Sequence, residues 1–440
     1  MRLLAPALLV GALLPATAAG AGAAPNVLVV MTDDQAAHGT MAVMPKTRRL
    51  IGRRGARFAQ AHATTPSCCP SRASFFTGRY AHNHGVTDNF AAARLDHDRT
   101  VQRLLRRRGY RTAIFGKFLN RWPLDVDPPH FDDWAVTEGG FYGTVWNDQG
   151  RMREPDRYST DFIAKRSLRF IRRAEAEDAR PWLAWVMPSA PHLPGTPARR
   201  HRNAPLPAFP LTPALTEDDF SDKPELTNAA RGFDEQIVAV RDDGRRALMA
   251  VDEMVARLVR ELRRRRELSR TLIVYTSDNG LLLGQHGGLA GKDLPYEAST
   301  RIPLMVRWDG TVAPRRMRRD LVSNVDVATT ILRAAGVRRR TDGKSLLAKR
   351  RRERLFLESF GARRDADTLA LPPWRALRTR RFVYAEYRSP DGELLDREYY
   401  DLRHDRWGLE NGVDGLGAAR VSGLSRTLAR LSRCKNRSCP

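Results

Sequence analysis

Four oxygen-bearing side chains follow apolar stretches of the sequence directly. Asp33 and Asp34 follow the run Asn26 to Met31, and Asp278 and Asn279 follow a second apolar run in the segment TLIVYTSDNG. Carboxylate and amide oxygens suit a hard divalent cation, Ca²⁺ or Mg²⁺, better than zinc. These residues therefore predict a divalent-metal site, although each pair alone would also serve as a helix N-cap or a turn.

Cationic and titratable side chains occur at comparable places. Lys117 follows a strand-like run and a glycine, His192 ends the segment WLAWVMPSAPH, and Lys292 lies in a glycine-rich segment. A metal and two lysines together would bind a tetrahedral oxyanion ester. His192 would protonate the leaving oxygen, which typically contributes about 10²–10⁴-fold in rate. Taken singly, the lysines are also consistent with surface residues and His192 with a structural core histidine.

The elements expected around these residues alternate between strand and helix. Short apolar runs predict buried strands within residues 26–31, 112–118, 182–192 and 271–280. Apolar residues at helical spacing predict helices over residues 248–262 and 325–334. This alternation predicts an α/β fold with a mostly parallel sheet, in which ligands bind at the carboxyl ends of the strands. The polar ends of the four segments are therefore expected to form one site.

The chain contains four cysteines, in two close pairs. Cys434 and Cys439 lie in the C-terminal sequence CKNRSCP, where their spacing in an exported protein predicts a small disulfide loop. Cys68 and Cys69 are adjacent, and adjacent cysteines do not readily bridge to each other because their Cβ atoms diverge. A disulfide between them is therefore not expected.

The N-terminus has the pattern of a secretory signal peptide. Arg2 precedes the apolar run Leu3 to Leu14, and small residues continue to Ala24. The run is too short to span a bilayer, and no other stretch predicts stable membrane insertion. We expect residues 1–24 to be cleaved and the protein to be a secreted or periplasmic bacterial protein.

The composition favours a globular protein with an anionic partner. Of the 440 residues, 42% are hydrophobic, which is enough for one large domain or two smaller ones. The formal net charge of +25 fits an acidic substrate or surface. Basic runs such as residues 263–266 are more simply a solvated, arginine-rich surface. No nucleic-acid-binding motif is present, so no nucleic-acid partner is expected.

The segment CCPSR, residues 68–72, with the following ASFFTGR resembles the signature of the sulfatase family. NVLVVMTDDQ, YTSDNG and YEASTRIPLMVR resemble further segments of that family, so the resemblance covers nearly the whole mature chain. It implies an alkaline-phosphatase-like α/β/α sandwich with a mostly parallel sheet and a smaller C-terminal α+β subdomain. HNHGV, DDFSDKP and GKFLN indicate the branch of N-acetylglucosamine-6-sulfatases and bacterial arylsulfatases.

The resemblance implies a modified nucleophile at Cys68. In this family a separate formylglycine-generating enzyme oxidises the matching cysteine to formylglycine (3-oxoalanine). The hydrated aldehyde attacks sulfur, the alcohol leaves, and sulfate is expelled as the aldehyde re-forms. One Ca²⁺ per chain would be held by Asp33, Asp34, Cys68, Asp278 and Asn279.

The resemblance also assigns the catalytic cations. Arg72 would steady the hydrated residue 68, Lys117 and Lys292 would bind the sulfate, and His192 would lie near the leaving oxygen. Cys69 occupies the variable position of the signature and is interpreted as a small buried side chain.

One segment departs from the family pattern. Residues 116–120 read GKFLN, where many sulfatases have Gly-Lys-Trp-His. A second histidine is therefore absent from the expected site, and His84 and Asn120 are weak candidates for its role.

The chain is expected to contain two parts after the signal peptide. Residues 25–337 would form the catalytic domain, with a long proline-rich loop from Leu193 to Leu226 that is a candidate functional segment. Residues 338–440 would form a C-terminal subdomain, because RLFLESF, WRALRTRRFVYAEY and EYYDL read as short strands of a small antiparallel sheet.

The function that follows is hydrolysis of sulfate esters. The expected substrate is a sulfated sugar such as N-acetylglucosamine 6-sulfate, with an aryl sulfate as an artificial substrate. Two alternatives stay open: a phosphomonoester or phosphonate-ester hydrolase of the same superfamily, and a non-catalytic protein that binds sulfated glycans with Cys68 unconverted.

Overall fold

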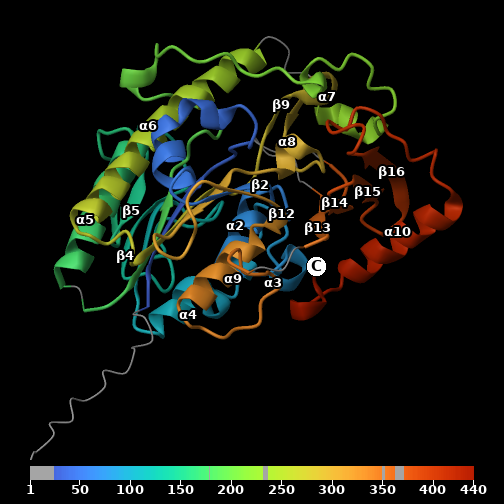
Figure 1. Cartoon of the computed structure of the whole chain (residues 1–440). Coiled ribbons are helices and arrows are strands. Elements are labelled where there is room, and N and C mark those ends of the chain that lie inside the picture. Colours follow the sequence, from blue (N-terminus) through green and yellow to red (C-terminus); the bar gives the residue numbers. More distant parts are fainter. Residues whose placement is uncertain (1–23, 178, 231–235, 349–351, 362–370) are drawn as a thin grey trace, which may run out of the picture.

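A computed structural model describes residues 24–177, 179–230, 236–348, 352–361 and 371–440, so all but the last residue of the expected signal peptide, residues 1–24, lies outside the described residues. Ten described strands form one large sheet (Figure 1). In its spatial order these strands are β12 (Arg316–Ser323), β2 (Ala56–His62), β11 (Leu304–Arg307), β8 (Thr271–Ser277), β1 (Asn26–Thr32), β7 (Trp182–Met187), β3 (Arg111–Lys117), β4 (Asp133–Thr137), β5 (Trp146–Asp148) and β6 (Arg151–Arg153).

The centre of this sheet is parallel. β8, β1, β7, β3 and β4 pair in parallel with one another, whereas β11 pairs antiparallel with both β8 and β2. All seven residues of β1 and all seven of β8 are buried. Parallel strands covered on both faces read as continuous apolar runs, which is why the sequence predicted these strands. β1, β3, β7 and β8 confirm those predictions.

Helices cover both faces of the sheet. α5 (Ser159–Glu177) and α6 (Gln236–Arg264) pack on one face, where Leu28 and Val30 of β1 meet Leu248 of α6 in one core. α2 (Cys68–Thr77), α4 (Val101–Arg106) and α9 (Val325–Ala334) pack on the other face (Figure 1). The predicted helix over residues 325–334 is confirmed, and the one over 248–262 is the central part of α6.

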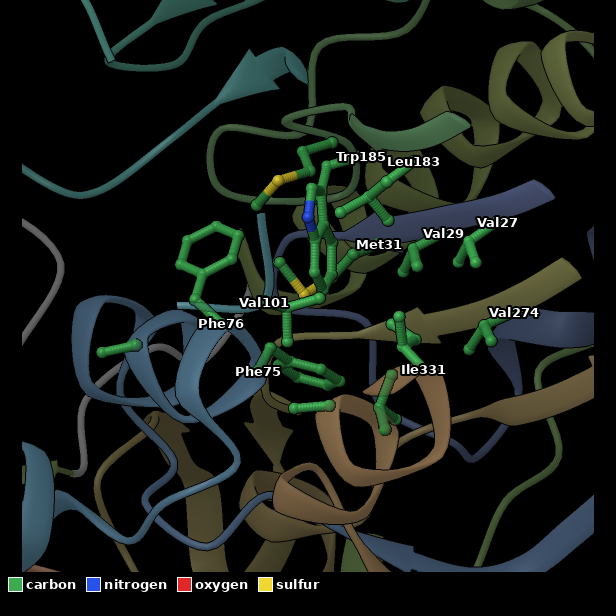
Figure 2. Packing of buried hydrophobic residues seen from close by; sticks show 14 of the residues in the cluster. Val27, Val29, Met31, Phe75, Phe76, Val101, Leu183, Trp185, Val274 and Ile331 are labelled. Atoms are coloured by element: carbon green, nitrogen blue, oxygen red, sulfur yellow. The ribbon is translucent and has the colours of Figure 1, made fainter. Parts of the chain in front are cut away.

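The second core fixes α2 against the strand centre. Figure 2 shows Phe75 and Phe76 of α2 among side chains from β1, β7, α4 and α9. The Phe76 and Trp185 rings meet edge to face with centroids 5.0 Å apart, an arrangement that adds about 0.5–1.5 kcal/mol to the burial itself. The helix that begins at Cys68 is therefore held rigidly on the sheet.

A second sheet lies near the C-terminus. β13 (Arg354–Ser359), β14 (Trp374–Thr379), β15 (Phe382–Arg388) and β16 (Leu394–Asp401) pair antiparallel in this order, and α10 (Ala418–Leu431) packs beside them (Figure 1). Cys434 and Cys439 form a disulfide, as predicted.

Shorter elements connect these layers: α1 (Pro45–Thr47), α3 (Ala81–His84), α7 (Gln285–Gly288), α8 (Glu297–Thr300), β9 (Leu282–Gly284) and β10 (Leu289–Gly291). In its described part, residues 188–230, the long loop after β7 contains three short 3-10 turns, Arg199–His201, Pro213–Leu215 and Glu225–Ala230. Within the described ranges, no helix combines the length and the apolar character that crossing a membrane requires.

Candidate active site

The two acidic pairs meet because their strands are parallel neighbours. β1 and β8 are in register at Thr32 and Ser277, so the residues that follow each strand leave the same edge of the sheet. The backbone N–H of Asp34 donates a 3.0 Å hydrogen bond to Asp278 Oδ1, and Asn279 Nδ2 donates to Asp34 Oδ1 at 2.6 Å. All four predicted metal-binding side chains on these strand ends thus lie together.

Lys117 reaches this edge from β3, two strands away from β1. Its Nζ lies 2.7 Å from Asp33 Oδ2. The preceding Gly116 has a φ of +120°, and a Cβ there would lie 1.9 Å from the carbonyl oxygen of Met187. Glycine is therefore required for β3 to pass this close to β7, and this close approach positions Lys117.

Cys68 is the first residue of α2 and is fully buried. Its Sγ lies 3.4 Å from Asp33 Oδ1 and 3.6 Å from Asp34 Oδ1. The side chain of Asn89 receives the Cys69 N–H at 3.0 Å, which satisfies one of the free donors at the helix start. Pro70 falls in the first turn, where its missing N–H costs no helical hydrogen bond.

Arg72 lies one turn after Cys68, on the same face of α2. Its Nε donates to Asp278 Oδ2 at 2.8 Å, and Nη2 lies 3.4 Å from Asp33 Oδ1. Its Nη1 donates to the carbonyl oxygen of Lys117 at 2.5 Å. One fully buried guanidinium therefore ties three strand ends to the helix that carries Cys68.

Lys292 and His192 complete the cluster from two loops. Lys292 Nζ lies 2.9 Å from Cys68 Sγ and 2.9 Å from Asp34 Oδ2. His192 Nδ1 lies 2.8 Å from the carbonyl oxygen of Leu193, and only a protonated nitrogen can bond to a carbonyl. The other ring nitrogen, Nε2, lies 3.6 Å from Asp34 Oδ2 and faces the site.

Burial and charge set the protonation of the cluster. Burial and the nearby Asp34 raise the pKa of the Cys68 thiol well above its usual range, although Lys117 opposes the shift. Burial would also raise the pKa of Asp33, but Lys117 and Arg72 outweigh it and hold that pKa well below its usual range. Cys68 is therefore a neutral thiol beside ionised carboxylates, and the thiolate that would act as nucleophile is strongly disfavoured.

Among the three carboxyl groups of the cluster, Asp278 has a raised pKa. Burial, followed by repulsion from Asp33, raises the pKa of the Asp278 carboxyl to about 7, against the attraction of Arg72. Three carboxylates this close together are stabilised by a cation placed between them.

The donor set fits a hard divalent ion. Carboxylate oxygens of Asp33 and Asp34 come within 4.8 Å of Cys68 Sγ and a His192 nitrogen. Asn279 Oδ1 is buried, and within the described part of the chain it has no hydrogen-bond partner. A buried amide oxygen without a donor costs free energy unless it has another ligand. Oxygen donors of this kind suit Ca²⁺ or Mg²⁺.

Two supporting contacts were not predicted from the sequence, where Ser71 appeared only as part of the CCPSR segment and Asn324 was not singled out. Asn324, the N-cap of α9, donates from Nδ2 to Ser71 Oγ at 2.9 Å and accepts the Thr64 N–H at Oδ1. Ser71 in turn donates to the carbonyl oxygen of Asp278 at 2.5 Å. An asparagine before an apolar helical run signals an N-cap, but its link to Asp278 depends on packing between distant segments.

The candidates for the missing histidine have different surroundings. His84 bonds through Nε2 to Ser74 Oγ at 3.0 Å and accepts the Val86 N–H at Nδ1, so both ring nitrogens are engaged outside the metal-site cluster. Burial lowers the pKa of His84 to about 3, so its ring is neutral. Asn120 Oδ1 is buried without a partner in the described structure. His84 is thus a structural residue here, whereas Asn120 stays a candidate.

Comparison with known proteins identifies the family. A family model described as sulfatase matches residues 25–337, and a model described as N-sulphoglucosamine sulphohydrolase, C-terminal, matches residues 284–431. A putative extracellular sulfatase Sulf-1 homolog of Caenorhabditis elegans is 33% identical over 385 residues, which cover 80% of this chain and 51% of that protein. N-acetylglucosamine-6-sulfatase of Homo sapiens is 32% identical over 361 residues, which cover 73% of this chain and 64% of that protein. The chain thus spans about half to two thirds of the length of these relatives.

The structural comparison supports the predicted fold. A protein solved in complex with its substrate D-glucosamine-2-N,6-O-disulfate has a TM-score of 0.74 and 24% identity, with 92% of this chain and 97% of that chain covered. The α/β/α sandwich with a mostly parallel sheet and a small C-terminal antiparallel sheet is therefore the alkaline-phosphatase-like fold that the sequence predicted. Together with the family model that matches most of its length, this fold places the chain in the sulfatase family.

Proposed function

We propose that this protein hydrolyses sulfate monoesters, R–O–SO₃⁻ and water giving R–OH, sulfate and a proton. The observation that carries the proposal is the position of Cys68. Cys68 begins α2 at the edge of the sheet where Lys117, Lys292 and the acidic residues after the strands come together. It also belongs to the CCPSR segment of a sulfatase-family chain.

The nucleophile is residue 68 in its formylglycine form. Formylglycine supplies a hydrated aldehyde oxygen that attacks sulfur, a task for which the buried, neutral thiol of Cys68 is unsuited. Conversion requires a separate formylglycine-generating enzyme that reaches the segment before α2 packs, because Cys68 is fully buried in the folded chain.

The metal is one Ca²⁺, held by Asp33, Asp34, Asp278, Asn279 and residue 68. It supplies positive charge that stabilises oxygen anions at residue 68 and on the substrate. The partnerless Asn279 Oδ1 and the raised pKa of Asp278 both support a cation at this place.

The surrounding cations act on the substrate and on residue 68. Lys117 and Lys292 bind the sulfate oxygens. Arg72 keeps residue 68 and Asp278 in fixed positions relative to each other. His192 Nε2 donates a proton to the leaving oxygen, because its Nδ1 is already held by a backbone carbonyl.

The substrate class is a sulfated sugar, with the 6-sulfate of an N-acetylglucosamine unit as the first candidate. This assignment is supported by identity to a protein named N-acetylglucosamine-6-sulfatase. Export to the periplasm or outside the cell, after removal of residues 1–24, would place the enzyme where such glycans occur. We assign residues 25–337 to the catalytic domain and residues 338–440 to the C-terminal subdomain, for which the separate β13–β16 sheet is the support.

The test compares matched esters on protein from its native host. We expect 4-nitrophenyl sulfate to be hydrolysed with a much higher kcat/KM than 4-nitrophenyl phosphate, and Cys68→Ala to abolish the activity. A clear preference for the phosphate ester would show that the protein is a phosphomonoester or phosphonate-ester hydrolase instead. Sulfated-glycan binding without any turnover would favour the non-catalytic alternative.

A second assay isolates the role of His192. A general acid matters most when the leaving oxygen is basic, so His192→Ala should lower kcat by about 10²–10⁴-fold on a sugar 6-sulfate and far less on 4-nitrophenyl sulfate. Equal losses on both substrates would show that His192 is not the acid.

A further inference from the structure

We propose that the active site continues past Asp34 into a second chamber that binds the anionic group of a neighbouring sugar, with Arg406 as the residue that recognises it. This inference rests on the proposed function, because it concerns the part of the substrate next to the reacting sulfate.

The chamber lies beside the catalytic cluster. Asp34 lines a small cavity of about 40 Å³ between α6 and the loops that follow β1 and β7. His38, Gln285 and Ala298 line this cavity and also a second one of about 160 Å³. Asp34, which contacts both Cys68 and Lys292, lines the first cavity, and the second cavity is its neighbour through the three residues that line both.

The size of the chamber limits its occupant. Pockets that take whole drug-sized ligands have volumes of roughly 300–1,000 Å³, and the second cavity is smaller than this range. It therefore suits one sugar substituent or one sugar unit rather than a length of polysaccharide.

Two arginines, Arg301 and Arg406, line the chamber, whereas its one lining carboxylate, Glu297, is shared with a further arginine, Arg378. Glu297 Oε2 lies 3.3 Å from Arg301 Nη1, and His286 Nδ1 lies 2.7 Å from Glu217 Oε2. Arg406 also lines the cavity, and none of the described carboxylates forms an ion pair with it. The Arg406 side chain is exposed to solvent, and together with Arg301 it gives the lining of the chamber more arginines than carboxylates, which favours an anionic ligand.

Arg406 is held in a suitable orientation by its neighbour. Its guanidinium carbon lies 4.6 Å from the centre of the Trp407 ring, and the Trp407 ring meets the His38 ring edge to face at 5.7 Å. A guanidinium stacked on an aromatic face keeps its N–H groups in its own plane, free to form two parallel bonds to one anion. The contact with Trp407 thus reduces the side-chain conformational entropy that Arg406 would lose when an anion binds.

The ligand chemistry follows from this donor arrangement. Carboxylate and sulfate both present two coplanar oxygens to a guanidinium fork. In a sulfated glycan these groups come from a uronic acid or from a sulfate ester on the adjacent sugar. The proposed recognition therefore favours an anionic disaccharide over a single 6-sulfated sugar.

The experiment uses three disaccharides with the same 6-O-sulfated glucosamine unit, joined to a neutral sugar, to a uronic acid or to a 2-O-sulfated neutral sugar. Sulfate release gives kcat/KM for the wild-type enzyme, for Arg406→Ala and for Arg403→Ala. Arg403 is a matched control, because it is an exposed arginine nearby that pairs with Asp401 and does not line the chamber.

We expect wild-type enzyme to prefer at least one anionic disaccharide over the neutral one, and Arg406→Ala to lower that preference about tenfold, while Arg403→Ala leaves it intact. The anionic disaccharide whose kcat/KM falls more in Arg406→Ala shows whether the bound group is a carboxylate or a sulfate. Absence of any preference in the wild type, or equal effects of the two variants, would overturn the inference.

A binding assay separates this inference from the proposed function. Equilibrium dialysis of the same three disaccharides against Cys68→Ala protein requires no turnover. A preference for the anionic disaccharides that Arg406→Ala removes would support the chamber even if the wild type hydrolysed no sulfate ester. Hydrolysis of 4-nitrophenyl sulfate without such a preference would retain the sulfatase and refute the chamber.

Discussion

Replacing Arg72 by methionine should destabilise the folded protein by about 3–5 kcal/mol, the usual cost of removing one partner from a buried ion pair. Arg72, Asp33 and Asp278 are all fully buried. Methionine fills much of the arginine's volume, but it leaves two carboxylates without their guanidinium contacts at 2.8 and 3.4 Å. It also removes the donor to the Lys117 carbonyl at 2.5 Å.

This magnitude is large relative to the stability of the protein. Folded domains are stable by about 5–15 kcal/mol, and each 1.4 kcal/mol is a tenfold change in equilibrium. Arg72→Lys should lose less than Arg72→Met because the charge remains. It should still lose about 1.5–3 kcal/mol, because one ammonium group cannot serve both carboxylates and a carbonyl.

The assay is urea unfolding in the presence of EDTA, which removes any contribution from bound metal. Arg166→Met is the matched control. Arg166 is a buried arginine that contacts Asp133 at 3.0 Å and Asp148 at 2.7 Å, and Asp133 begins β4 at the end opposite Lys117. We expect both variants to lose stability, but only Arg72→Met to lose kcat per folded molecule. An Arg72→Met protein within about 1 kcal/mol of the wild type, with Arg166→Met strongly destabilised, would refute the buried network.

Three further outcomes test other parts of the structure. Changing Cys434 and Cys439 to serine should cost about 2 kcal/mol from the lost closure of a short loop, given their sequence separation of 5; wild-type protein that unfolds no earlier in urea with a reductant would contradict this. Burial would lower the pKa of His82, but its hydrogen bond to Glu358 raises it overall. The stabilisation of the folded protein by this pair is therefore complete below about pH 6.5 and is lost as the pH rises through the folded-state pKa of His82. The difference in urea midpoint between the wild type and His82→Gln should shrink from about pH 5.5 to about pH 8.5. A constant difference would exclude this ion pair. Ca²⁺ at a hundred times its Kd should stabilise the EDTA-treated protein by about 2.7 kcal/mol, and Asn279→Leu should weaken that effect; an unfolding curve insensitive to Ca²⁺ would argue against the metal site.

The strands that position the site were predictable because burial on both faces leaves a simple pattern. β1, β3, β7 and β8 are continuous apolar runs, and polar residues begin where each ends. Parallel pairing then brings those polar ends to one edge, which the alternation of strands and helices implied. The convergence of Asp33, Lys117 and Asp278 follows from this topology.

Other elements could not be predicted from local pattern. All ten residues of α2 are buried, so the helix has no polar face and no amphipathic period to detect. β12 has the sequence RMRRDLVS and is largely exposed over its first half, so it lacks the apolar run of a central strand. Asn324 and Ser71 support Asp278 only through packing between segments more than two hundred residues apart.

The most direct measurement of the central claim is mass spectrometry of the tryptic peptide FAQAHATTPSCCPSR, residues 58–72, from protein made in its native host. The account predicts that residue 68 has the mass of an aldehyde in place of its thiol, that Cys69 stays a thiol, and that the converted fraction scales with sulfatase activity across preparations. Two intact thiols in a preparation that hydrolyses sulfate esters at full rate would contradict the proposed nucleophile.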